Sequence, residues 1–185
     1  MVIAPTVATA VVCGNILGVF NLLEWEVRDT FFRLRPFEGQ DTAIVIVTID
    51  EFDIRAAKDW PIPDEILADL LRKIAVQQPR AIGLDVYRDL PEEPGYDQLE
   101  EVFQTTPALI GVEKIIGNRV NPPPALAEVG QVGLADLVLD ADRKVRRALL
   151  TAEDAEADGA IKACLATQVA LTYLDKEEIC LEAVN

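Results

Sequence analysis

The chain has 185 residues, a formal net charge of −15 and no histidine. Its length suits one domain, and a hydrophobic content of 50% is sufficient for a buried core. The strong negative charge repels nucleic acid and anionic lipid headgroups, which argues against a nucleic-acid-binding protein. The missing histidine excludes a Ser-His-Asp triad, a Cys-His pair, a histidine-ligated zinc and a phosphoaccepting histidine within this chain.

The N-terminal run from Val2 to Leu23 contains no charged residue. A run of this length can cross a bilayer, because about 20 apolar residues span the hydrocarbon core. We therefore expect a membrane anchor, and the alternative is a buried helix or strand of a soluble domain. Arg28, Arg33 and Arg35 follow the run, and the positive-inside tendency alone would place the following domain in the cytoplasm.

An amphipathic helix is predicted from Leu22 to Pro36. Its apolar residues recur at helical spacing, and they are Leu23, Val27, Phe31 and Leu34. Pro36 ends the pattern, and the linker "FEGQD" follows. We therefore divide the chain into an N-terminal apolar segment with a juxtamembrane helix (1–36) and a globular domain (37–185).

The first part of the globular domain alternates between strand and helix patterns. "AIVIVTI" (43–49) is apolar and β-branched, as in a strand that is covered on both faces. An amphipathic helix is predicted at 64–78, with acidic residues in its first turn, and a second strand at 81–86. A strand, a helix and a strand in this order predict a βαβ unit with parallel strands.

The later elements continue the alternation. We expect a helix at 96–106, a strand at 108–114, a short helix within 118–130, a strand at 145–152, a helix at 160–174 and a closing strand at 178–184. The predicted fold class is α/β, with a mixed, partly parallel sheet, helices packed on it and a preceding N-terminal helix.

The three cysteines are odd in number and lack metal-ligand spacing. A Cys164–Cys180 disulfide is compatible with the sequence, but we favour two unpaired buried thiols. The cysteines therefore do not indicate whether the chain resides in a reducing or an oxidising compartment.

Two predicted strands end in aspartates, Asp50 and Asp85. Parallel strands bring their carboxyl ends to one edge of the sheet, where open α/β sheets bind ligands, and Glu51 adds charge there. We expect Asp50 and Asp85 to lie within about one side-chain length of each other. The alternative is that each aspartate only caps its loop by accepting hydrogen bonds from backbone N–H groups.

No glycine-rich phosphate-binding loop is present. The D-x-D in "LDADRKVRR" is not an EF-hand loop, because Lys144 and Thr151 occupy positions that need ligands. We expect instead a turn in which basic side chains pair with acidic neighbours, the candidates being Asp140, Asp142, Arg143, Arg146 and Arg147.

Several of these segments, taken in order, resemble the CHASE domain family of type two. They are "LLEWEVRDTFFRLRP", "IVIVTIDEFDI", Trp60-Pro61 with the leucine-rich helix, "AIGLDVY" and "DLVLDADRKVRRALL". The resemblance covers roughly Leu22 to Leu174. The chain departs from the family pattern at Ile62-Pro63-Asp64, where a basic pair often stands, and at Arg143, where the family has glycine in a turn that needs a positive φ.

The resemblance implies an extracytoplasmic sensing domain of a bacterial signalling protein. In this family one N-terminal helix precedes the sensor, and further membrane helices and a cytoplasmic cyclase, kinase or other effector follow it. We therefore expect a non-enzymatic sensor at the cell membrane, facing the periplasm, that responds to an unknown small molecule or physical signal as a homodimer. No cofactor and no nucleic acid are expected.

The candidate ligand-binding residues are Asp50, Glu51, Asp85, Trp60 and Arg146, and no metal is specified. The alternative function is a metal-dependent α/β hydrolase or phosphatase-like enzyme that uses Asp50, Asp53 and Asp85 on Mg²⁺.

Overall fold

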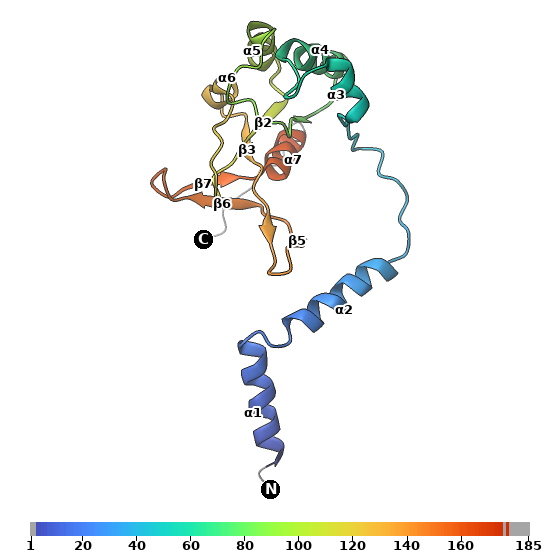
Figure 1. The fold of residues 1–185 in the computed structure, drawn as a ribbon, viewed down its shortest axis with the longest axis vertical. Coiled ribbons are helices and arrows are strands. Elements are labelled where there is room, and N and C mark those ends of the chain that lie inside the picture. The colour runs from blue at the N-terminus through green and yellow to red at the C-terminus, as the bar shows by residue number, and fades with distance from the viewer. Residues whose placement is uncertain (1–2, 176, 178–185) are drawn as a thin grey trace. The chain divides into compact units, whose positions relative to one another are not determined.

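The computed structural model describes residues 3–175 and residue 177, and it divides into two compact units, Met1–Thr48 and Ile49–Asn185. The first unit contains α1 (Ile3–Ile16) and α2 (Asn21–Leu34), drawn in blue in Figure 1. The uncharged run is therefore not one helix. Gly18 lies in the turn that separates α1 from α2, with a φ of 71° that glycine adopts without steric cost.

Helix α2 confirms the predicted amphipathic helix, and it ends at Leu34, before Pro36. None of its described side chains is buried. Leu23, Val27 and Phe31, which form its apolar stripe, are all exposed. The stripe therefore has no packing partner among the described residues of this unit.

The strand predicted at 43–49 is absent, and the prediction was wrong. Side chains from Ile44 to Val47 are 54–82% exposed, and the described residues provide no ladder partner for this segment. A strand needs a neighbour to satisfy its backbone N–H and C=O groups, whatever its β propensity. The chain instead runs without regular structure into α3 (Glu51–Ala57).

The second unit is built on a three-stranded parallel sheet with the order β1-β2-β3. Its strands are β1 (Ile82–Gly83), β2 (Leu109–Glu113) and β3 (Val132–Leu134). Helix α5 (Tyr96–Thr105) connects β1 to β2, and α6 (Pro124–Glu128) connects β2 to β3, so both connections are βαβ crossovers. This confirms the α/β fold with a partly parallel sheet and a preceding helix, although the strand predicted at 81–86 is shorter.

Helices cover both faces of this sheet (Figure 1). On one face α4 (Asp64–Val76), α5 and α6 form the core with Ile82 of β1 and with Leu84, which directly follows β1. On the other face α7 (Leu165–Asp175) contacts β1, β2 and β3. Gly133 lets β3 approach α7 closely, because a Cβ at this position would lie 2.6 Å from the Cα of Leu165. The helices predicted near 64–78, 96–106 and 118–130 are thus confirmed.

Two antiparallel hairpins follow the sheet: β4 (Val138–Leu139) with β5 (Val145–Arg147), and β6 (Thr151–Asp154) with β7 (Ala160–Ala163). The single strand predicted at 145–152 is therefore two strands. The helix predicted at 160–174 begins as strand β7 and becomes helical only at Leu165. Cys164 is buried between β7 and α7. The strand predicted at 178–184 and Cys180 lie outside the described residues.

Candidate functional site

The carboxyl ends of the three parallel strands each carry an acidic residue. Asp85 lies two residues after β1, Glu113 is the last residue of β2, and Asp136 lies two residues after β3. The strands are parallel, so these residues lie at one edge of the sheet, where α/β domains place ligand sites. We call it the acidic edge. Asp50 is not part of it, because no strand precedes Asp50.

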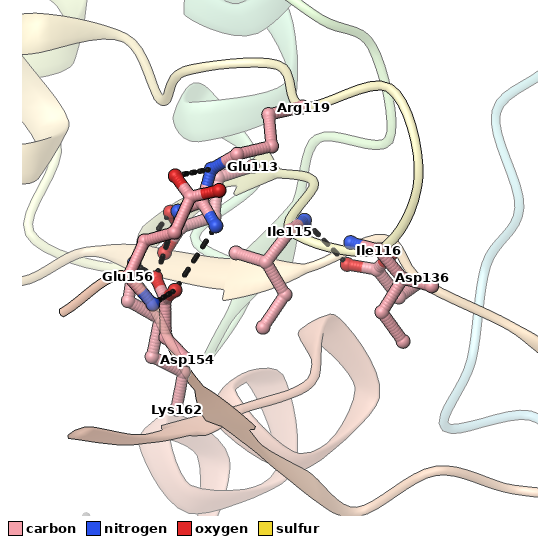
Figure 2. A network of polar contacts seen from close by, with 8 residues as sticks. All are labelled: Glu113, Ile115, Ile116, Arg119, Asp136, Asp154, Glu156 and Lys162. Atoms are coloured by element: carbon pink, nitrogen blue, oxygen red, sulfur yellow. Dashed lines mark hydrogen bonds and ion pairs between the residues drawn. The ribbon is translucent and has the colours of Figure 1, made fainter. Parts of the chain in front are cut away.

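Asp136 holds the loop that follows β2. It is 5% exposed, and its two carboxylate oxygens accept hydrogen bonds from the N–H groups of Ile115 and Ile116, each at 2.9 Å (Figure 2). Burial, followed by the charge of Asp136, raises the pKa of Tyr87 and of the Cys164 thiol. Asp136 is thus a buried negative charge whose oxygens already fix the backbone around it.

An ionic network joins β2 to the β6–β7 hairpin (Figure 2). Lys162 Nζ lies 2.7 Å from Glu113 Oε2 and 3.2 Å from Asp154 Oδ2. Arg119, in the loop after β2, donates two hydrogen bonds to Asp154, at 3.0 and 2.9 Å, and its Nε lies 3.3 Å from the exposed carboxylate of Glu156. Side chains from three separate segments therefore meet at the acidic edge.

The charges of this network reinforce one another. The hydrogen bonds from Arg119 hold the pKa of Asp154 well below its usual range, and the same contact raises the pKa of Arg119. Burial lowers the pKa of Lys162, but its hydrogen bonds to Glu113 and Asp154 outweigh this effect, and the pKa is raised. Glu113 and Asp154, the two buried carboxylates of this network, thus each have a cationic partner. This arrangement holds the hairpin at a defined position on the sheet edge.

A second ion pair, Asp64–Arg88, is fully buried. Arg88 Nε lies 3.1 Å from Asp64 Oδ1, and the side chains are 4% and 1% exposed. Arg88 also donates to the carbonyl of Ile62 at 2.7 Å, and Asp64 accepts from the N–H of Glu92 at 2.9 Å. The pair therefore ties the loop after β1 to the start of α4. A small recess beside it is lined by apolar side chains that include Leu99 and Phe103.

The predicted site residue Asp50 is the N-cap of α3. Its Oδ1 accepts hydrogen bonds from the N–H groups of Phe52 at 2.7 Å and Asp53 at 3.1 Å, and Asp53 accepts from the N–H of Asp50 at 2.9 Å. This reciprocal arrangement is a capping box. Glu51 is exposed in the first turn of the helix. Asp50 thus has the capping role that the sequence analysis gave as the alternative.

The other predicted ligand-binding residues do not gather around Asp50. Asp85 is exposed at the acidic edge, two residues after β1, whereas Asp50 lies at the N-terminus of α3. Trp60 is 59% exposed in the turn before α4. Arg146 lies on β5, in the β4–β5 hairpin. Ligand binding by these residues stays a prediction.

The turn predicted around Asp140 and Asp142 is confirmed. Arg146 contacts Asp140 at 3.0 Å and Asp142 at 2.6 Å, and Arg147 pairs with Asp140. Arg143 adopts a φ of 65°, so the positive φ of the family's turn is kept although glycine is replaced. These pairs lie within the β4–β5 hairpin and stabilise its turn.

We expect the Arg146 pairs to make the free energy of unfolding depend on pH in acid. The hydrogen bond from Arg146 lowers the pKa of Asp142 to about 2, and Asp140 is shifted in the same direction. An unfolded aspartate titrates near ~3.9, so the stabilisation is complete above about pH 4 and is lost as the pH falls to about 2. In Arg146→Met this part of the pH dependence should shrink, as measured by urea unfolding across that range. An unchanged slope would contradict the assignment.

Most of the acidic edge and the buried ion pair were not predicted from the sequence. The missed residues are Asp64, Arg88, Glu113, Arg119, Asp136, Asp154 and Lys162. One signal was available, because "VGLAD" ends at Asp136 as "AIGLD" ends at Asp85. The same apolar run with a terminal aspartate marks the ends of β3 and β1.

Among residues 3–175 and 177, no single helix is both long and apolar enough to cross a membrane. The pair Ala4–Ile16 and Asn21–Leu34, bent by 73°, meets the length and composition requirement only when taken together. Within the same residues, no group of three or more Cys, Asp or Glu side chains is arranged to hold a metal ion.

The fold and the acidic edge define an α/β domain whose parallel sheet is closed at its carboxyl edge by an ion-paired hairpin. Comparison with protein families gives a match to the CHASE2 domain over residues 6–183. The chain belongs to the CHASE2 domain family, a family of extracytoplasmic sensory domains, which confirms the resemblance seen in the sequence. No curated protein and no solved structure gives a significant match.

Proposed function

We propose that this chain is the signal-input domain of a bacterial membrane-bound signal-transduction protein. The observation that carries the proposal is the CHASE2 match over residues 6–183. In this proposal the second unit lies outside the cytoplasm and regulates a cytoplasmic output domain such as a cyclase or kinase. The exposed apolar side chains of α1 and α2, which include Val11, Leu23 and Phe31, support attachment to a membrane.

The acidic edge is the proposed place where a signal acts. Only Cys164 separates β7 from α7, and Lys162 of β7 is bonded to Glu113 of the sheet. A small molecule that binds to these charged side chains, or a force that separates Lys162 from Glu113, would shift the β6–β7 hairpin and α7 together. A signal then changes the populations of two arrangements of a homodimer. Of the predicted ligand-binding residues, Asp85 is the one that lies at the acidic edge, where it is exposed.

A chimera tests the proposal. Residues 1–185 are joined to the membrane helices and kinase of a reporter receptor, and kinase output is measured in intact bacteria. Lys162→Met is expected to change the output by at least about fivefold, because coupling free energies between sites are commonly 1–3 kcal/mol. A chimera whose output is the same for every variant, and equal to that of the receptor without an input domain, would contradict a sensor role.

A further inference from the structure

Helix α1 carries no charge on any side, and the described residues of the first unit leave it uncovered. None of its residues from Ile3 to Ile16 is charged, and residues 4–13 are all exposed. A helix that is mostly apolar all round is stable where apolar material surrounds it. Lipid tails surround a helix on every side, whereas a protein partner covers one face. The exposure of α1 on all sides therefore favours a bilayer as its surroundings.

A sharp bend separates α1 from α2. The segments Ala4–Ile16 and Asn21–Leu34 are bent by 73° relative to each other, and the turn between them contains only residues 17–20. When α1 runs along the normal of a bilayer, α2 therefore runs close to the plane of the membrane. A helix in this orientation presents one side to lipid and the opposite side to water.

Helix α2 has the two sides that this orientation requires. Helical geometry places Leu23, Val27 and Phe31, its apolar stripe, within about 80° of one another around the helix axis. The three side chains are 53–70% exposed. The charged side chains of α2 all lie outside this arc, and they are Glu24, Glu26, Arg28, Asp29 and Arg33. Helices with an apolar side and a charged side lie in the membrane interface, with the apolar side buried by about 5–10 Å.

We propose that α2 is an interfacial helix whose apolar stripe lies at the boundary between phospholipid headgroups and acyl chains. A bilayer is favoured over a protein partner because α2 begins only one short turn after the uncharged helix α1. A zwitterionic surface is favoured over an anionic one, because the net charge of the chain is −15. The inference rests on the membrane attachment in the proposed function, and it adds how the chain meets the bilayer.

Phe31 and Phe32 form a matched pair for the test. They are adjacent in α2 and are 70% and 66% exposed. Phe31 belongs to the apolar stripe, whereas Phe32 points about 140° away from the centre of the stripe. An interfacial helix therefore holds position 31 in lipid and position 32 in water.

Tryptophan fluorescence of the full chain in phosphatidylcholine vesicles distinguishes the two positions. The chain has two tryptophans, so Trp25→Phe and Trp60→Phe leave each introduced tryptophan as the single reporter. Phe31→Trp is expected to emit at a shorter wavelength and to lose most of its fluorescence to phosphatidylcholine brominated on the upper acyl chain. Phe32→Trp should lose little fluorescence to this lipid and should instead be quenched by iodide in the water.

Three results would overturn the inference. Equal quenching of both reporters by brominated lipid would place all sides of α2 within the bilayer. Iodide quenching of both would place α2 in water. A short-wavelength emission from Phe31→Trp that brominated lipid does not quench would assign the stripe to a protein partner. If Phe31→Trp lowers the helix content measured by circular dichroism, Val27→Trp replaces it, and the chain with only Trp60→Phe reports from Trp25 on the opposite side.

The same measurements separate this inference from the proposed function. The expected quenching together with a silent reporter chimera would refute the signal-input role alone. A responsive chimera whose two reporters behave alike would overturn the interfacial position of α2 alone. A chain that does not bind the vesicles at all would refute the membrane attachment and the inference together.

Discussion

Replacing Arg88 with methionine is expected to lower the free energy of unfolding by about 3–5 kcal/mol, because the change leaves an uncompensated buried charge. Asp64 is 1% exposed at its side chain, and Arg88 is its ion-pair partner. The change also removes the hydrogen bond to the Ile62 carbonyl, which joins the loop before α4 to the loop after β1. Urea unfolding followed by circular dichroism measures the effect.

Arg72→Met is the matched control for this prediction. The Arg72 side chain is 39% exposed and lies 3.3 Å from both Asp69 and Glu101, so water screens these pairs. Its loss should cost at most about 1 kcal/mol. The double variant Asp64→Leu/Arg88→Met should recover part of the lost stability, because no unpaired charge remains. Equal costs for Arg88→Met and Arg72→Met would show that the buried pair is not structurally important.

Gly95→Ala is expected to destabilise the domain by about 3 kcal/mol or more, because it combines a steric clash with a strained backbone. Gly95 has a φ of 108°, and a Cβ there would lie 2.3 Å from the backbone nitrogen of Glu65. That nitrogen donates a hydrogen bond to the Pro94 carbonyl at 2.9 Å. The clash is with backbone at the start of α4, so no side-chain rotation relieves it.

Gly117→Ala separates the two contributions. Gly117 has a φ of 75°, but nothing lies within 4 Å of a Cβ placed there. It should therefore show only the cost of the left-handed conformation, about 1–2 kcal/mol. Thermal unfolding of both variants gives the comparison. If Gly95→Ala cost no more than Gly117→Ala, the close packing of the 95 loop on α4 would be wrong.

The helices of this domain were predictable because their signals are local. Helix α4 has acidic residues in its first turn and buries Leu67 and Leu71 from one stripe, as the periodicity indicated. Helix α2 ends just before Pro36, which cannot continue a helix.

The strands were less predictable because each depends on a partner that the local sequence does not reveal. The run at 43–49 has the residues of a strand but no neighbour among the described residues. Conversely, Ala160–Ala163 belongs to a segment with a helical pattern but pairs with β6, so tertiary pairing overrides local propensity.

The acidic edge was predictable only in part, for the same reason. Asp85 follows a parallel strand, as the sequence predicted, whereas Asp50 caps a helix. The ionic network joins residues that are far apart in the chain: Arg119 and Asp154 are 35 residues apart, and Glu113 and Lys162 are 49 apart. No local spacing indicates such pairs. The predicted site therefore differs from the acidic edge for two reasons. Residues 43–49 form no strand, so Asp50 does not lie at the sheet edge, and the ionic network depends on long-range contacts.

We propose that this chain is a signal-input domain whose acidic edge controls an output. The most direct test is the kinase output of the reporter chimera with Lys162→Met, Lys162→Arg and, as a control, Lys73→Met on the exposed side of α4. We expect a changed output for Lys162→Met and no effect of Lys73→Met. Lys162→Arg should give a level close to wild type, because it keeps the charge beside Glu113 and Asp154. Identical output from all three folded variants would contradict this proposal.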